Sequence, residues 1–116
     1  MIAVIFEVEP ADGEFETYMD LAAALRPELE RIDGFISVER FRSMTDPNRY
    51  LSLSFWRDEE AVRRWRNMSS HRGAQGMGRS KVFRDYRLRV AAVSRDYSMS
   101  ERDEAPDDSR AVLAAD

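Results

Sequence analysis

The sequence contains no cysteine, a single histidine and no long apolar segment. Without cysteine there is no disulfide, no thiolate metal site and no cysteine nucleophile. No apolar run approaches the roughly 18 residues that a membrane-spanning helix needs. The first residues, MIAVIFEVEP, have no basic region and alternate like a strand, unlike a secretory signal. We therefore expect a cytoplasmic protein with no membrane contact.

The net charge of −4 lies almost entirely near the carboxyl end of the chain. Residues 97–116 carry six acids and two arginines, so that residues 1–96 balance to zero. The arginines around position 64 follow acids by four residues, as expected for ion pairs on a solvated helix. No nucleic-acid-binding motif is present, and we expect no nucleic-acid partner.

Hydrophobic periodicity predicts one domain with six main elements. Strict alternation predicts four strands, and an apolar stripe with steps of three and four predicts a helix from a cap at Asp12 to a stop at Gly34. A second helix follows a cap at Asp58. The predicted strands are 2–9, 35–43, 50–56 and 82–95.

The resulting order, β-α-β-β-α-β, is that of a ferredoxin-like α+β fold with an antiparallel four-stranded sheet and helices on one face. Residues 1–97 form this domain. Residues 98–116 form an acidic tail, in which DDSRAVLAA predicts a short docking helix.

The strand at 50–56 has one apolar face and one face that is aromatic and polar, and the helices can cover only one of them. Leu51, Leu53 and Phe55 suit the helix side, which assigns the other set to the uncovered face. A partly apolar sheet face requires a partner, so we expect a homodimer that packs sheet against sheet and encloses a cavity. The set assigned to that cavity is Tyr50, Ser52, Ser54 and Trp56.

Four segments together resemble the antibiotic biosynthesis monooxygenase (ABM) domain family of the dimeric α+β barrel superfamily. They are IDGFISVERF, LSLSFWRDEEAVRRW, HRGAQ and FRDYRLRVAAVSRDY. The resemblance covers about residues 1–97 and implies a dimeric α+β barrel. It also implies a monooxygenase that oxidises small aromatic or polyketide-like phenols without flavin, haem or metal, in a pocket between sheet and helices.

Transferred onto this sequence, the family's oxygenases imply a site on the third strand. Trp56 matches their strand-end tryptophan, and their asparagine position falls on Ser52, whose hydroxyl can bind a phenolate oxygen. Tyr50 and Ser54 share that face and are expected to bind substrate. Trp65 is expected to stack on an aromatic ring.

Haem-degrading relatives imply an alternative function. Trp65 matches their second tryptophan, their axial histidine position falls on Gln75, and their strand-one asparagine position falls on Phe6. Phe6 and Gln75 are therefore counted among the substrate-binding candidates. A non-enzymatic small-molecule-binding or stress-response dimer is a further alternative.

His71 is the candidate catalytic base, because an imidazole titrates near neutral pH and a phenol has to lose a proton before it can reduce oxygen. We expect the segment 65–75 to cover the mouth of the pocket with His71 facing inward. A surface histidine on an ordinary helix is the alternative. No metal-ligand cluster is visible in the sequence.

Overall fold

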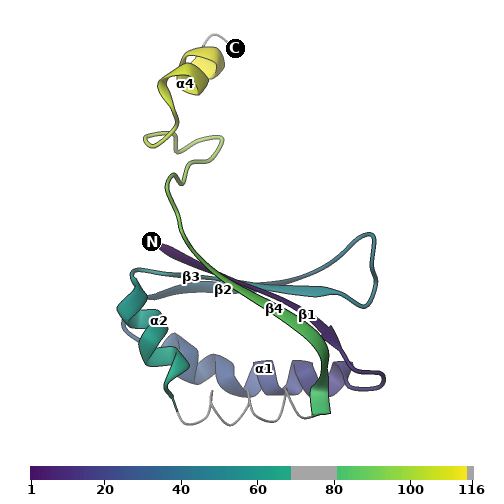
Figure 1. Cartoon of the computed structure of the whole chain (residues 1–116). Helices are drawn as coiled ribbons and strands as arrows, with labels where there is room; N and C mark the ends of the chain where they lie inside the picture. Colours follow the sequence, from purple (N-terminus) through teal and green to yellow (C-terminus); the bar gives the residue numbers. More distant parts are fainter. Residues whose placement is uncertain (69–80, 115–116) are drawn as a thin grey trace.

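The computed structural model describes residues 1–68 and 81–114, with side chains described as far as residue 110. The predicted ferredoxin-like α+β fold is confirmed (Figure 1). Its body consists of β1 (Ile2–Pro10), α1 (Phe15–Glu30), β2 (Phe35–Arg42), β3 (Tyr50–Trp56), α2 (Glu59–Arg66) and β4 (Phe83–Ala92). The helix α4 (Asp107–Ala114) follows in the tail.

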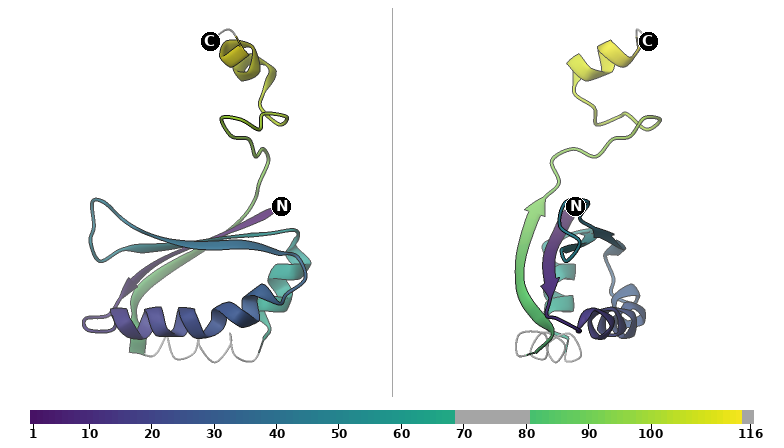
Figure 2. Two further views of the ribbon diagram at one scale, coloured as in Figure 1. Left: turned by 180° about the vertical axis from the view of Figure 1, so that it is seen from behind. Right: turned by 90° about the vertical axis from the view of Figure 1, so that its right-hand side faces the viewer.

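The four strands form one antiparallel sheet in the order β2-β3-β1-β4. Because paired residues in a sheet point to the same side, the register defines rows of side chains that run across the strands. One such row joins Arg40, Ser52, Phe6 and Leu88, taken from β2 to β4. Figure 2 shows α1 and α2 lying on the same side of this sheet.

The side chains that face the helices form two apolar clusters, one toward each end of the sheet. The first is built around Val4, Leu29, Trp56, Ala61 and Val62. The second is built around Val8, Tyr18 and Val82, with Phe6 and Tyr50 packed against it. The cross-sheet row that contains Ser52 lies between the cores of the two clusters.

The predicted faces of β3 are wrong. Trp56 is fully buried in the helix-side core, and its cross-strand partner Ile2 packs against the same core, so the set from Tyr50 to Trp56 faces the helices. Leu51, Leu53 and Phe55 face the opposite, uncovered side and are only partly buried. Both sets are apolar enough to pack, so alternation along β3 alone does not determine which set faces the helices.

The two predicted helix caps have different outcomes. Asp58 caps α2 as predicted, since its carboxylate accepts the backbone N–H of Ala61 at 2.9 Å. Asp12 does not cap α1, whose N-cap residue is Glu14, and instead pairs with Arg84 on β4. Gly34 ends the loop after α1 with a φ of 96°, the left-handed conformation predicted for it.

The tail leaves the body after β4, as Figure 1 shows. The radius of gyration is 16.9 Å, against the roughly 13 Å expected of a compact domain of this length. Arg110 donates to the carbonyl oxygens of Asp103 and Ala105, so the tail is ordered by its own contacts. The predicted tail helix is present as α4 and stands apart from the sheet. None of the helices in the described ranges is long and apolar enough to cross a membrane.

Candidate active site between sheet and helices

Trp56 and Trp65 stack on one another beneath the sheet. Their ring centroids are 5.1 Å apart with an angle of 21° between the planes, and Phe35 meets Trp56 edge-on at 5.3 Å. The indole N–H of Trp56 donates to the Ser54 hydroxyl at 2.9 Å. Trp56 is 0% exposed, so its indole N–H needs a hydrogen-bond partner inside the protein, and Ser54 provides it. Trp56 is therefore buried in the core and is not among the residues that line the cavity described below.

A cavity of about 40 Å³ lies beside this pair, between α1 and the sheet. Three residues of the predicted site line it, namely Ser52, Ser54 and Trp65, together with Arg26, Arg40 and apolar side chains of α1 and β2. This volume holds about one water molecule. A ligand can enter only if side chains that line the cavity move.

A larger groove of about 470 Å³ adjoins the cavity along the edge strand β2. The two spaces share Arg26, Val38 and Arg40 as lining residues. The groove falls within the size range of small-molecule sites, about 300–1,000 Å³. The groove is otherwise lined mainly by side chains of the uncovered face, among them Glu39, Leu53 and Phe55.

Tyr50 and Phe6 lie on the correct side of the sheet but belong to the second apolar cluster. Tyr50 stacks on Phe15 at 4.8 Å, and Phe6 packs against Phe83 at 5.7 Å. Neither residue lines the cavity. The structure therefore brings Ser52, Ser54, Trp56 and Trp65 together. Phe6 lies opposite Ser52 on β1, and Tyr50 lies two residues before Ser52 on β3, and both pack against the second cluster.

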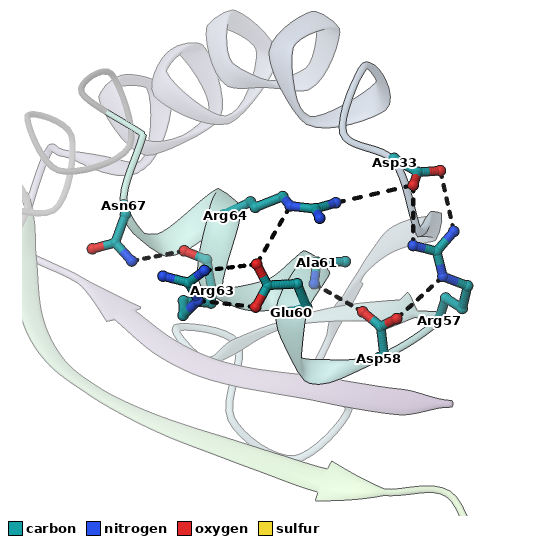
Figure 3. A network of polar contacts seen from close by, with 8 residues as sticks. All are labelled: Asp33, Arg57, Asp58, Glu60, Ala61, Arg63, Arg64 and Asn67. Atoms are coloured by element: carbon teal, nitrogen blue, oxygen red, sulfur yellow. Dashed lines mark hydrogen bonds and ion pairs between the residues drawn. The ribbon is translucent and has the colours of Figure 1, made fainter.

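A network of ion pairs surrounds the start of α2, the helix that carries Trp65 (Figure 3). Arg57 donates to both carboxylate oxygens of Asp33 at 3.1 Å and to Asp58 at 3.2 Å. The hydrogen bond from Arg57 is the main reason that the pKa of Asp33 is held below its usual value. This network joins the loop before β2 to the start of α2. Each exposed pair contributes little to stability alone.

Of the two i,i+4 ion pairs predicted on α2, Glu60 with Arg64 is present, whereas Arg63 pairs with Glu60 and not with Glu59. Glu60 pairs with Arg63 at 2.6 Å and with Arg64 at 3.6 Å, so one carboxylate serves two arginines (Figure 3). The pKa of Glu60 is lowered mainly by the hydrogen bond from Arg63. The charges of Arg63 and Arg64 are thus partly balanced by Glu60 on the same helix, as expected for a solvent-exposed helix face.

The sequence interpretation did not identify two other polar groups near the cavity. The Tyr18 hydroxyl and the Nε of Arg40 are both buried and lack a hydrogen-bond partner. Burial raises the pKa of Tyr18, and the nearby Arg40 guanidinium partly opposes that shift. A buried polar group without a partner costs about 1–3 kcal/mol. Alternation placed Arg40 on the same strand face as Val38, but it could not distinguish this arginine from its solvated neighbours.

His71 and Gln75 lie outside the described residues, as does the segment predicted to cover the pocket mouth from residue 69 onward. Their predicted roles stay predictions. Within the two described ranges, no group of three or more histidines, cysteines or acids could hold a metal ion.

The model of the family described as "Antibiotic biosynthesis monooxygenase" matches residues 1–77. The chain is 51% identical over 94 residues to a protein of Pyricularia oryzae named jasmonate monooxygenase ABM. That match covers 81% of this chain and 44% of the relative, so the chain spans less than half of the relative's length. YqjZ of Bacillus subtilis, an uncharacterised protein, is 34% identical over 98 residues, covering 80% of this chain and 79% of YqjZ.

Solved structures share the fold at lower identity. A variant of SnoaB from Streptomyces nogalater, described as a cofactor-independent oxygenase, superposes with a TM-score of 0.71 at 15% identity, covering 82% of this chain and 94% of SnoaB. Rv0793 of Mycobacterium tuberculosis superposes with a TM-score of 0.74 at 18% identity, covering 84% of this chain and 98% of Rv0793. With the match over residues 1–77 and the two sequence relatives, these observations show that the chain belongs to the antibiotic biosynthesis monooxygenase family.

Proposed function

We propose that this protein is a monooxygenase that oxidises a small aromatic or polyketide-like substrate in the pocket between the sheet and the helices. The observation that carries the proposal is the cavity lined by Ser52, Ser54 and Trp65, in a chain of this family. Trp65 offers an aromatic wall, and the Ser54 hydroxyl still has its own proton to donate after accepting from Trp56.

The proposed reaction needs no flavin, haem or metal because the substrate supplies the electrons. A phenol whose keto tautomer carries a ring CH₂ group, such as an anthrone, becomes on loss of a proton an electron-rich anion that can reduce molecular oxygen. Oxidation of a ring CH₂ group to a carbonyl takes one atom of O₂ into the product. The other atom leaves as water with the two hydrogens of the CH₂ group. The protein's part is to orient the anion and to accept the proton, for which we propose His71 as the base.

Oxygen uptake by the purified protein tests this function. The substrate set comprises quinols, an anthrone and jasmonate, which the name of the Pyricularia relative suggests. We expect uptake with at least one of these compounds without added cofactor. A hemin titration alongside separates the haem alternative, since tight hemin binding without uptake on any substrate would contradict the proposal.

We also propose that the protein acts as a homodimer that packs through the outer face of the sheet. Leu51, Leu53 and Phe55 lie on this face, and the helices lie on the other side. Charges of both signs flank the apolar side chains, as in the pair of Glu7 with Arg89 at 2.9 Å. A face that carries both signs can complement a second copy of itself about a two-fold axis. A sedimenting species of 13.5 kDa at micromolar concentration would contradict this assembly.

A further inference from the structure

Arg40 and Tyr18 present unpartnered donors from opposite walls of the same interior. Tyr18 projects from α1 and is 5% exposed, and Arg40 projects from β2 toward the helices. The Tyr18 O–H and the Arg40 Nε–H are both buried and unpartnered, and each can donate a hydrogen bond. The Arg40 guanidinium interacts with the Tyr18 hydroxyl, whose oxygen can itself accept a hydrogen bond. Tyr18 lines neither the cavity nor the groove, so Arg40 is the one of the two that can meet an acceptor supplied by a ligand.

Arg40 also lacks a compensating negative charge. Among the described residues, no carboxylate lies within 4.0 Å of its guanidinium, whereas Arg57 pairs with both Asp33 and Asp58. The adjacent acid Glu39 faces the other side of the sheet, where its cross-strand partner is Leu53. A half-buried cation without an acid is costly to maintain, so a functional explanation is needed.

The position of Arg40 connects this charge to the candidate active site. Arg40 lines both the cavity beside Trp65 and the larger groove that opens along β2. Its cross-strand partner is Ser52, which lines the same cavity. The other cation at the junction, Arg26, already pairs with Glu30 at 2.9 Å. One guanidinium is therefore left for the ligand.

We propose that the pocket binds a small amphipathic carboxylic acid, with its carboxylate held by Arg40 and its apolar body directed toward Ser52, Ser54 and Trp65. This inference rests on the proposed function and names the class of its substrate. One guanidinium balances one negative charge, and its planar fork of N–H donors suits the two oxygens of a carboxylate. The apolar walls of the cavity, from α1, Val38 and Trp65, suit an uncharged body.

Binding of matched acids and esters tests the proposal without requiring turnover. The probes are phenylacetate, 1-naphthylacetate and jasmonate, each compared with its methyl ester. The two tryptophans of the chain, Trp56 and Trp65, both lie at the site, so intrinsic fluorescence reports occupancy. We expect at least one acid to bind about 10-fold or more tightly than its ester, the usual effect of a hydrogen bond to a charged group. If no acid binds more tightly than its ester, the proposal is wrong.

Variants of Arg40 locate the effect. Arg40→Gln is expected to weaken binding of the acid about 10-fold or more and to leave the ester within about two-fold. Arg40→Lys keeps the charge and loses the planar fork, so its effect on the acid is expected to be smaller. Arg31→Gln removes the same charge from an exposed position at the end of α1 and is the matched control. Equal weakening of acid and ester by Arg40→Gln would overturn the proposal.

Thermal unfolding separates a binding role of Arg40 from a structural one. Because Arg40 has a buried Nε without a partner, Arg40→Gln is expected to unfold at the wild-type temperature or above it. If Arg40→Gln does not fold, Arg40 has a structural role and the proposal is wrong for the carboxylate contact.

The same experiments distinguish this proposal from the proposed function. Acid selectivity that depends on Arg40, without oxygen uptake on any substrate, would support the carboxylate site and contradict the monooxygenase. Oxygen uptake that is equal for acids and esters and unaffected by Arg40→Gln would support the monooxygenase and contradict the carboxylate site.

Discussion

The indole of Trp56 donates its N–H to the hydroxyl of Ser54, two residues earlier on the same strand, at 2.9 Å. Both residues are almost completely buried, at 0% and 3% exposed. This internal bond allows a tryptophan to occupy the core beneath the sheet without an unsatisfied polar group. It also holds the Ser54 hydroxyl at the cavity wall, so the packing of the core and the geometry of the site depend on one contact.

Replacing Ser54 by alanine is expected to destabilise the protein by about 1–3 kcal/mol, because the buried Trp56 N–H loses its acceptor. Chemical denaturation followed by tryptophan fluorescence measures this. Ser52→Ala is the matched control on the same strand face, two positions away from the contact. Equal free energies of unfolding for the Ser54 variant and the wild type would contradict the assigned role.

Replacing Gly34 by alanine is expected to lower stability by more than about 1 kcal/mol, the cost of a left-handed backbone for a residue with a side chain. At φ 96° the new methyl group would also lie 2.8 Å from the Cβ of Ala61, inside α2. A fall of several degrees in the midpoint of thermal unfolding is the expected result. Gly13 has a similar φ of 77°, but a methyl group there would meet no atom within 4 Å. Comparing Gly13→Ala with Gly34→Ala therefore isolates the loss of stability caused by the clash with Ala61.

The ion-pair network around Asp33 predicts a specific loss of stability in acid. Its folded pKa lies below the ordinary value of 3.8, so its contribution is present above about pH 4 and is lost as the pH falls through the folded pKa. Asp33→Asn is expected to be less stable than the wild type at pH 7 and to converge with it near pH 2. Thermal unfolding between pH 2 and pH 7 measures the convergence.

The matched control for Asp33 is Asp20→Asn, an exposed carboxylate on α1 without an ion pair among the described residues. A difference between Asp33→Asn and the wild type that persists unchanged at pH 2 would contradict the linkage.

Replacing His71 by alanine is expected to lower turnover about 100-fold or more, the usual effect of losing a general base. Because the proposed role is chemical, the temperature of unfolding is expected to change little. Adding imidazole to the reaction is expected to restore part of the activity. Undiminished turnover in this variant would contradict a catalytic role for His71 and would favour the alternative, a surface histidine on an ordinary helix.

The strand and helix order was predictable because alternation and the three-to-four spacing are strong signals in this sequence. The faces of β3 were not, since Tyr50 and Trp56 are as apolar on one side as Leu51 and Phe55 are on the other. Only the cross-strand register with Val4 and the stacking on Trp65 determine which side is covered.

The candidate site was predictable in part. Ser52, Ser54 and Trp65 line one cavity, and it lies on the helix side of the sheet, whereas the sequence pattern placed Ser52 and Ser54 on the uncovered side. Arg40 could not be identified, because β2 carries charges on both faces and its pattern reads as solvated. Its significance depends on an absence of partners in three dimensions, which a linear pattern does not encode.

Incorporation of isotopic oxygen tests the central claim most directly. The purified protein, dialysed to remove any bound cofactor, is incubated under ¹⁸O₂ with the substrate that gives the fastest oxygen uptake, and the product is analysed by mass spectrometry. The account predicts one ¹⁸O atom in each product molecule and the same rate when flavin or hemin is added. Product oxygen derived from water, or turnover that appears only with an added cofactor, would contradict it.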